Sequence, residues 1–291
     1  MSVYGYPVLP RAGLGNMLFP WADCHLWCRD NNREMIAPSW RKIRIGPLLR
    51  GERDMREYHR LFDRTGQIGG WSKWLRLLMS RKVRFTGTLD VMTCPGETVV
   101  VFDDLDCFPR LAGRHRELRE GLYRMTRSRY LPDQARRRPY VGIHVRLGDY
   151  LPPDAPTRPG SHYRLELPWY GEALREIRRI AGYGVEAVLF SDGTDEELRE
   201  LLSVENVTRS PHRAAVTDLL ALAEAGVIIA SRSTFSMWGS FLGQVPAVWH
   251  PGSRIRSVVE AGEPGGLEPE WSPGRHLPEL FSQTVRERLD T

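Results

Sequence analysis

Apolar and polar positions in the second half of the chain follow a pattern typical of strands that alternate with helices. Short apolar runs are separated by longer segments in which apolar residues recur every three or four positions. The predicted strands are 140–145, 186–190, 205–209, 227–230 and 246–249, and the predicted helices are 168–181, 194–202, 216–225 and 234–243. This alternation predicts βαβ units and a parallel sheet.

The first half of the chain is less regular. The expected strands are 3–9, 83–86 and 98–103, and the expected helices are 16–30, 52–63, 71–80 and 111–130. The best linker candidate is the polar, proline-bounded stretch 131–139. We therefore expect a first domain over 1–135 and a second over 136–276. A closing C-terminal helix is expected within 277–291, at about 277–289.

Charge and composition narrow the class of partner. A chain of 291 residues with net charge +5 accommodates two medium domains, and its basic surface favours anionic ligands such as nucleotide-sugars or phospholipid head groups. No dense Lys/Arg block with interleaved aromatics occurs, so nucleic acid is not an expected partner. The Arg-rich helix 111–130 is either a solvated face or a contact to an anionic membrane.

Several patterns bear on the cellular location. No apolar stretch approaches the roughly 20 residues of a membrane span. The first ten residues lack the basic and apolar regions of a signal peptide. The four cysteines form no C-x-x-C pair and are expected to be buried free thiols. These patterns predict a cytoplasmic protein with at most peripheral contact at the inner face of a membrane.

The apolar run 140–145 is followed by residues suited to an anionic ligand. His144, Arg146 and Asp149 lie at or just after its end. In open α/β sheets, ligands bind outside the carboxyl ends of strands, and a guanidinium suits a diphosphate. The alternative is structural: His144 packs within the strand, and Arg146 and Asp149 pair with each other at a surface turn.

A glycine-rich turn precedes the first predicted helix. Gly13, Gly15 and Asn16 would let a ligand approach the backbone at a helix N-terminus. This is not the dinucleotide fingerprint, because Leu18 stands where that pattern needs a third glycine. The alternative is an ordinary tight turn with Asn16 as the N-cap.

A third segment follows the predicted strand 227–230. Ser233 or Thr234 is the expected N-cap of the next helix, where free N–H groups and hydroxyls suit a phosphate. The alternative is plain helix capping, and Phe235 and Trp238 are expected in the core in either case. Upstream, Asp218 could accept hydrogen bonds from guanine, or could be a solvated or capping residue in the first turn of its helix.

Together, these segments resemble the α-1,2-fucosyltransferases. The segment from Gly13 to Phe19 resembles their G-L-G-N-Q-x-F opening, and that from His144 to Tyr150 resembles their H-x-R-R-x-D motif. Phe190-Ser191-Asp192 resembles F-S-D, and the segment from Ser233 to Trp238 resembles S-T-F-S-W-W. The order and rough spacing agree over about residues 11–245.

The resemblance implies a GT-B-type α/β fold, with two Rossmann-like domains facing a cleft and the donor held mainly by the second. It implies an inverting glycosyltransferase that uses GDP-fucose without a metal cofactor and acts on an oligosaccharide or glycoconjugate. By position, Arg146 would bind the diphosphate and assist the departure of GDP. The other implied donor contacts are His144, Asp192, Asp218, Ser233, Thr234 and Phe235, and Gly13, Gly15 and Asn16 would border the cleft.

The catalytic base and the exact sugar stay open. Asp149, Asp23 and the acids of 103–106 are the candidates for the base. The sequence departs from the family pattern at four positions, with Met17 for Gln, Leu147 for the second Arg, Gly193 for a common second acid and Met237 for the first Trp. A transferase of another nucleotide-sugar and an inactive nucleotide- or sugar-binding protein are the alternatives.

Overall fold

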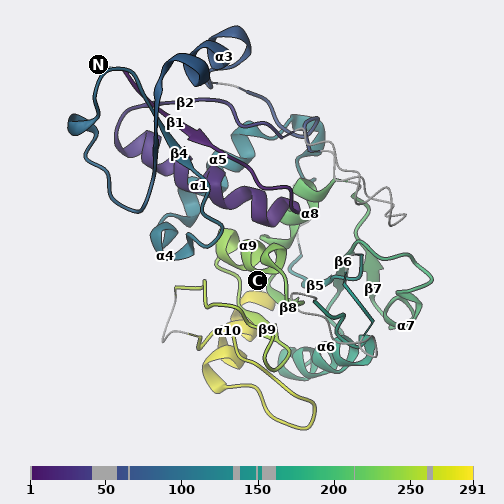
Figure 1. Cartoon of the computed structure of the whole chain (residues 1–291). Coiled ribbons are helices and arrows are strands. Elements are labelled where there is room, and N and C mark those ends of the chain that lie inside the picture. Colours follow the sequence, from purple (N-terminus) through teal and green to yellow (C-terminus); the bar gives the residue numbers. More distant parts are fainter. Residues whose placement is uncertain are drawn as a thin grey trace. The chain divides into compact units, whose positions relative to one another are not determined.

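The chain folds as two compact units, Met1–Leu131 and Pro132–Thr291, and each is described by itself (Figure 1). The computed structural model describes residues 2–40, 58–64, 66–133, 138–148, 150–152, 162–212, 214–260 and 265–290. Each unit is built on a parallel sheet with helices packed against it. Among the described residues, no helix combines the length and the apolar character that crossing a membrane requires.

The first unit contains a four-stranded sheet in the order β2-β1-β4-β3, and all of its pairings are parallel. The strands are β1 (Val3–Pro7), β2 (Glu34–Met35), β3 (Arg81–Arg84) and β4 (Thr98–Phe102). The sequence predicted β1 and β4. It also predicted β3, which begins and ends two residues before the predicted strand 83–86. It missed β2, because two residues are too few to show an alternation of apolar and polar positions.

The helices of the first unit differ more from the prediction. They are α1 (Leu14–Asp30), α3 (Gly70–Met79), α4 (Phe108–Leu111) and α5 (His115–Met125), with short 3-10 turns at Val91–Thr93 and Ser128–Tyr130. The single helix expected at 111–130 is wrong, since Gly113 adopts a left-handed φ of 74° that separates α4 from α5. The described part of the helix expected at 52–63 is also wrong, because Phe62 forms an isolated bridge with Thr126 there; residues 52–57 lie outside the described part of the chain.

The second unit contains a five-stranded sheet in the order β7-β6-β5-β8-β9, again with every pairing parallel. The strands are β5 (Val141–Val145), β6 (Ala187–Ser191), β7 (Val207–Arg209), β8 (Val227–Ala230) and β9 (Ala247–Trp249). The helices are α6 (Leu167–Ala181), α7 (Arg199–Leu202), α8 (Ala215–Leu222), α9 (Thr234–Gly243) and α10 (Glu279–Leu289). The prediction was right for every strand and, apart from the late start of α7, for the helices.

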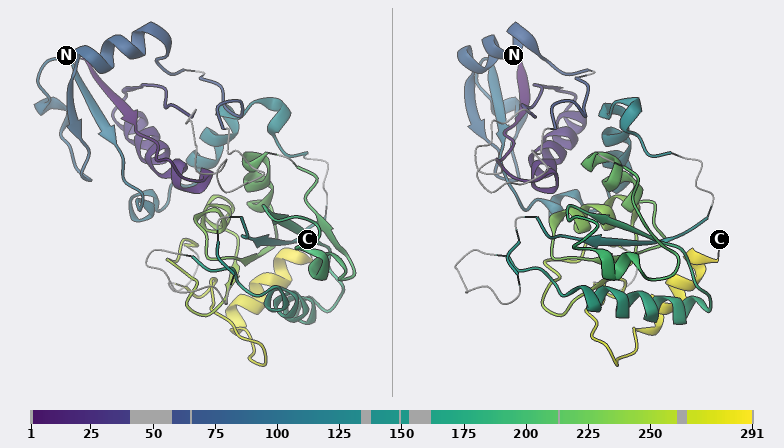
Figure 2. Two further views of the ribbon diagram at one scale, coloured as in Figure 1. Left: turned by 45° about the vertical axis from the view of Figure 1, so that its right-hand side comes forward. Right: turned by 90° about the vertical axis from the view of Figure 1, so that its right-hand side faces the viewer.

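The core of the second unit explains why its strands could be predicted from the sequence. Helices cover both faces of the second sheet (Figure 2). Alternate residues of β5 face these opposite layers: Ile143 packs in a cluster with residues of α6 and α10, whereas Gly142 faces α8. A Cβ at Gly142 would lie 2.7 Å from Leu222 Cδ1 and 3.1 Å from Ala225 Cβ, so glycine here allows the close approach of α8. Apolar residues on both faces are the expected signature of a parallel strand buried between helices.

The strand order also creates a switch point. From β5 the chain runs to β6 and β7 on one side, and then returns to β8 and β9 on the other. The segments that follow β5 and β8 therefore leave neighbouring strand ends in opposite directions. In sheets of this kind, ligands bind in the crevice that forms at this point.

Candidate functional site

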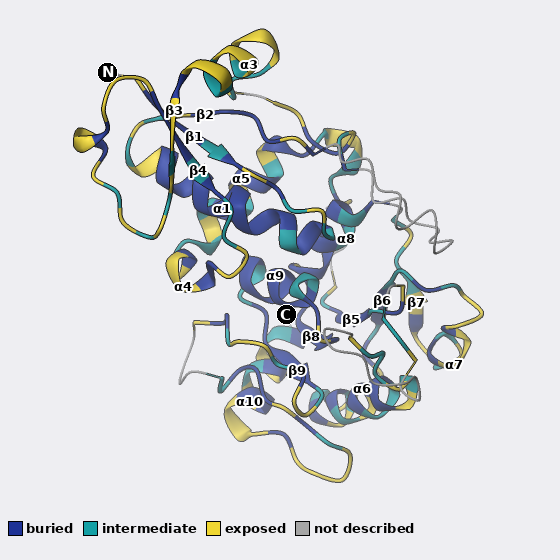
Figure 3. Cartoon of the chain, in the orientation of Figure 1, coloured by how far each residue is buried: buried dark blue, intermediate teal, exposed yellow. Residues whose placement is uncertain are grey.

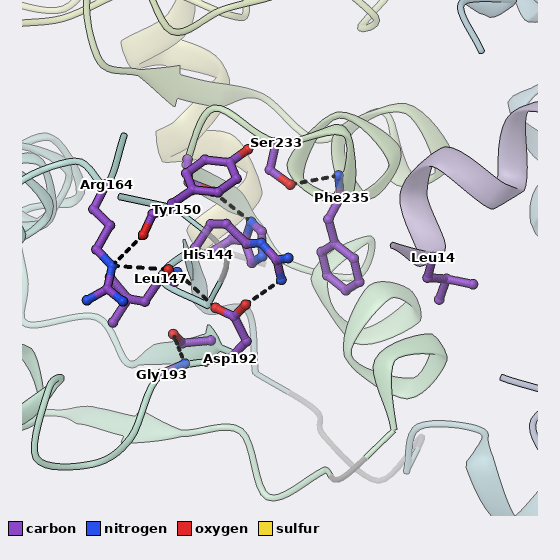
Figure 4. A network of polar contacts seen from close by, with 12 residues as sticks. Leu14, His144, Leu147, Tyr150, Arg164, Asp192, Gly193, Ser233 and Phe235 are labelled. Carbon is purple, nitrogen blue, oxygen red and sulfur yellow. Dashed lines mark hydrogen bonds and ion pairs between the residues drawn. The ribbon is translucent and has the colours of Figure 1, made fainter. Parts of the chain in front are cut away.

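An ion pair lies at the carboxyl ends of β5 and β6. Arg146 follows β5 directly, and Asp192 follows β6. Asp192 accepts a hydrogen bond from Arg146 Nη1 and another, at 2.9 Å, from the Leu147 backbone N–H (Figure 4). The two charged side chains are only 21% and 17% exposed. Asp192 therefore holds the guanidinium in place at the edge of the sheet.

Two glycines allow this close packing. A Cβ at Gly148 would lie 2.3 Å from Asp192 Oδ2, and a Cβ at Gly193 would lie 2.4 Å from Leu147 Cδ1. Leu147 is 4% exposed and belongs to the hydrophobic core. The position where the resemblance expects a second arginine thus faces the core, and Gly193 in place of a second acid makes room for its leucine.

The segment after β5 is tied to the segment after β8. The Tyr150 hydroxyl donates a hydrogen bond of 2.5 Å to the backbone oxygen of Arg232. Arg164 Nε donates to the backbone oxygens of Leu147, at 3.1 Å, and Tyr150, at 3.0 Å. The Tyr150 ring centroid lies 5.8 Å from the Arg146 guanidinium carbon. These contacts fix the backbone around Arg146 across the switch point.

His144, in β5, contacts the segment that follows β8 and the start of α9. Its Nδ1 lies 2.7 Å from Ser236 Oγ and 3.1 Å from Ser231 Oγ, and its ring stacks on Phe235 with centroids 4.8 Å apart. Burial lowers the pKa of His144 to about 3, so the ring is neutral at pH 7. His144 is thus a packed strand histidine whose ring positions the start of α9, and it adds no charge to the site.

The N-terminus of α9 borders the site. Ser233 is its N-cap, as predicted, and Ser233 Oγ accepts a hydrogen bond of 3.2 Å from the Phe235 N–H. Thr234 begins the helix, and no acidic residue occupies the first turn, so the positive end of the helix dipole is not neutralised there. Trp238 is fully buried as expected. Phe235 is only half-buried, because its ring stacks on His144 instead of entering the core.

Asp218 belongs to a cluster at the β7 side of the sheet. It lies in the first turn of α8, as expected, and accepts a hydrogen bond of 2.5 Å from Ser210 Oγ. His212 Nδ1 lies 3.4 Å from the same carboxylate. A cavity of about 360 Å³ opens beside His212, and its lining includes Phe190, Pro211, Ala221 and Glu224. Its volume falls in the range of small-molecule pockets.

The glycine-rich turn of the first unit has a different character. Gly13 is the N-cap of α1, so Asn16 lies inside the first turn, and its expected role as N-cap is wrong. The helix begins earlier than predicted, because the Tyr58 hydroxyl accepts a hydrogen bond of 3.2 Å from the Leu14 N–H. Gly15 is buried in the same turn and Asn16 is half-buried. A Cβ at Gly13 would meet nothing within 4 Å.

The acidic candidates of the first unit are held by arginines. Arg110 Nη2 lies 2.7 Å from both Asp23 Oδ2 and Asp104 Oδ2. Arg84 Nε lies 2.8 Å from Asp103 Oδ1. Burial raises the pKa of Asp23, and the contact with Arg110 opposes this shift. Asp23, Asp103 and Asp104 are thus each paired with an arginine of the same unit.

Asp149, the second predicted catalytic residue, lies outside the described residues. Four other residues that shape the site were given no role by the sequence. Ser231 and Ser236 fall inside the segment already singled out, so their spacing around Ser233 is a usable signal. Tyr150 and Arg164 act through backbone carbonyls, which leave no sequence pattern. Within the described ranges, no group of three or more His, Cys, Asp or Glu residues is placed to hold a metal ion.

Comparisons with known proteins address the fold. No model of a protein family matches the chain, and no curated protein matches it in sequence. Among solved structures, the NodZ α-1,6-fucosyltransferase co-crystallised with GDP is 15% identical with a TM-score of 0.50, covering 86% of this chain and 95% of that one. Selenomethionine NodZ from Bradyrhizobium is also 15% identical, with a TM-score of 0.51 and coverages of 87% and 96%.

A second fucosyltransferase structure gives a lower score. POFUT1 in complex with GDP is 14% identical, with a TM-score of 0.48 over 85% of this chain and 97% of that one. At these identities the likeness to NodZ concerns the fold alone. The predicted fold class is confirmed: the chain is an α/β protein with two parallel sheets, and it matches GT-B fucosyltransferase structures.

Proposed function

We propose that this chain is an inverting glycosyltransferase that transfers L-fucose from GDP-fucose to a hydroxyl of an oligosaccharide or glycoconjugate. The observation that carries the proposal is Arg146, which Asp192 holds at the switch point beside the N-terminus of α9. A partly buried guanidinium at the edge of the sheet, next to a helix N-terminus, is suited to a diphosphate. The fold shared with NodZ, a fucosyltransferase crystallised with GDP, supports the same donor.

In this proposal the second domain, 136–276, holds the donor. Arg146 binds the diphosphate, while the N–H groups at the start of α9 and the hydroxyls of Ser233 and Thr234 complete the anion site. The exposed part of Phe235 offers a flat surface for the nucleotide. Asp192 acts through Arg146 as a positioning residue.

Asp218 is the proposed guanine contact. A carboxylate can accept hydrogen bonds from both the ring N–H and the amino group of guanine, which uracil does not offer together. Asp218 lies 3.4 Å from His212 Nδ1, and His212 lines the cavity that also reaches Phe190. The first domain, with Gly13, Gly15 and Asn16, is the proposed acceptor side.

The chemistry is a single displacement at the anomeric carbon. The acceptor oxygen forms the new bond as the bond between the sugar and the β-phosphate oxygen breaks, and the electron pair leaves with GDP. Negative charge therefore grows on the diphosphate, where Arg146 and the N-terminus of α9 stabilise it. The acceptor proton passes to a base, for which Asp149 stays our candidate.

One alternative is a transferase that uses a different nucleotide-sugar. In that case Leu147 and Met237, which depart from the family pattern, would line a reshaped donor pocket. Both side chains are buried in the core, so these two departures from the family pattern concern packing. A catalytically inactive nucleotide- or sugar-binding protein is the second alternative; if it recognised the nucleotide, it would bind GDP without turnover.

Calorimetric titration with GDP, GDP-fucose and UDP, in the presence of a chelator, tests the donor. We expect GDP and GDP-fucose to bind and UDP not to. Preference for UDP, or no nucleotide binding, would overturn the donor assignment. Product analysis by NMR then decides the linkage: the sequence motifs favour an α-1,2 bond, whereas NodZ is an α-1,6-fucosyltransferase.

A further inference from the structure

Helix α3 of the first unit presents its apolar face to solvent. None of its ten residues is buried. Five of its six large apolar side chains are 53–85% exposed (Figure 3), and they are Trp71, Trp74, Leu75, Leu78 and Met79. Their spacing of three and four residues makes one continuous stripe along the helix, which is the pattern that normally faces a protein core. Here the stripe faces outward.

The opposite face of α3 points into the unit, where Leu77 packs against the core and the two cations of the helix are anchored. Lys73 Nζ donates hydrogen bonds to the Ala37 backbone oxygen, at 2.6 Å, and to Ser39 Oγ, at 3.0 Å. The Arg76 guanidinium carbon lies 4.7 Å from the centroid of the Tyr4 ring. The helix is therefore fixed with its apolar stripe outward, because two of its cations are anchored on the inner side.

The surroundings of the stripe are uniformly basic in sequence. Between Asp63 and Asp90 the chain has no acidic residue and six basic ones. Two of these, Arg81 and Lys82, are exposed on β3, the edge strand that follows α3 directly. An apolar stripe bordered by cations complements an anionic lipid bilayer, whose interior is apolar and whose head groups are negatively charged.

The arginine-rich helix α5, suggested by the sequence as a membrane contact, lacks this complementarity. Arg114 Nη2 lies 2.7 Å from Asp30 Oδ1, and Arg114 Nε lies 2.5 Å from Glu117 Oε1. Arg124 lies 3.8 Å from Glu120. Arg114, at the N-cap of α5, and Arg124 are thus paired with carboxylates, and α5 itself carries Glu117 and Glu120. The segment between Asp63 and Asp90, by contrast, has no acidic residue of its own.

We propose that α3 and the start of β3, residues 70–82, form a docking surface for an anionic lipid bilayer. The two tryptophans and the aliphatic stripe enter the boundary between head groups and acyl chains, and Arg81 and Lys82 contact the anionic head groups. This surface belongs to the first unit, whereas the residues of the proposed donor site belong to the second, and it gives the protein a peripheral position at a membrane. A second copy of the chain is a poorer occupant, because a symmetric contact would bring the two basic segments against each other.

Vesicle flotation of the full chain tests this proposal, with phosphatidylcholine vesicles that do or do not contain phosphatidylglycerol. We expect binding to the anionic vesicles that falls with added salt. The double variant Trp71→Ala/Trp74→Ala should reduce partitioning into the vesicles by at least about tenfold, because each substitution removes a large apolar surface. The double variant Arg81→Gln/Lys82→Gln should reduce it by about tenfold or more at low salt.

Matched controls come from the same unit. Met92→Ala removes an apolar side chain that is 81% exposed outside α3, and Arg116→Gln/Arg124→Gln removes two exposed charges from α5. Both controls should bind vesicles as the wild type does. Circular dichroism and GDP titration of every variant separate a loss of docking from a loss of fold or of the donor site.

Three results would overturn the proposal. The first is no binding to anionic vesicles by the wild type, or equal binding to neutral ones. The second is equal binding by the Trp71→Ala/Trp74→Ala variant. The third is a wild-type dimer in light scattering that the same variant converts to a monomer without vesicle binding, which would make a second copy the occupant.

Discussion

The two units place a helix N-terminus near the carboxyl edge of a parallel sheet, but they surround it differently. In the second unit, Ser233 caps α9 through its side chain, and Arg146 lies at the neighbouring strand end. In the first unit, α1 begins at Gly13 with no side-chain cap, and its Leu14 N–H bonds to the Tyr58 hydroxyl.

This difference indicates where an anion is expected. A partly buried cation is costly unless it is paired, and the second unit fixes Arg146 with a single well-placed carboxylate at the switch point. In the first unit, Arg110 is shared by two carboxylates, Asp23 and Asp104, so this cluster carries an excess of negative charge. Arg146 and Asp192 instead form a one-to-one pair beside a helix N-terminus that has no acidic residue in its first turn. The same sheet-and-helix architecture therefore favours an anion at the edge of the second sheet and disfavours one at the edge of the first.

Removing the cation should have the largest effect. We expect Arg146→Ala to lower the transfer rate by about 10²–10³-fold, because one preorganised donor to the developing charge is lost. GDP affinity should fall as well, and the melting temperature should fall modestly, because Asp192 loses its ion-pair partner. Arg175→Ala, which removes an exposed arginine of α6 paired with Glu172, is the control and should transfer normally. Turnover by Arg146→Ala at the wild-type level would end the assignment of the donor site.

Restoring the family's second arginine should damage the fold instead of improving the site. Leu147→Arg would place an unpaired charge in a core position, and we expect the free energy of unfolding to fall by about 3 kcal/mol. Chemical denaturation measures this change, with Leu147→Met as the volume-conserving control. A stable Leu147→Arg variant that binds GDP more tightly would show that position 147 faces the donor.

The second unit was more predictable from sequence than the first for a physical reason. Strands such as β5 and β8 are buried on both faces, so their apolar runs are unbroken and easily recognised. In the first unit, β3 has only one residue that is not exposed, and β2 is two residues long. Neither carries enough apolar pattern to identify it.

The candidate site was predictable in its parts but not in its connections. The motifs located Arg146 and Ser233 correctly next to strand ends. The partnership of Arg146 with Asp192 joins residues 46 positions apart and depends on strand order, which no local pattern reveals. For the same reason the sequence could not show that Leu147 turns into the core while Arg146 faces the edge of the sheet.

The pH dependence of stability tests the buried histidine of the second unit. His144 has a pKa of about 3 when folded, below that of an exposed histidine, so between about pH 6.5 and 3 only the unfolded chain binds this proton. The free energy of unfolding should therefore fall as the pH drops through this window, by up to about 1.4 kcal/mol per pH unit. His144→Gln should flatten the slope between pH 6.5 and 4.5, whereas His276→Gln, which replaces an exposed histidine, should not. Parallel slopes in wild type and His144→Gln would contradict a neutral buried ring.

The smallest effect is expected at the turn of the first unit. Gly13 has φ −61° and ψ 167°, a conformation open to any residue, and a Cβ there would enter open space. Gly13→Ala should therefore leave stability unchanged or raise it by up to about 1 kcal/mol, because alanine restricts the unfolded chain. GDP affinity should stay within about twofold if the second unit alone holds the donor. A marked loss of GDP affinity in a fully folded Gly13→Ala variant would mean that the donor also approaches this backbone, and the contrast between the first edge and an anion-binding second edge would fail.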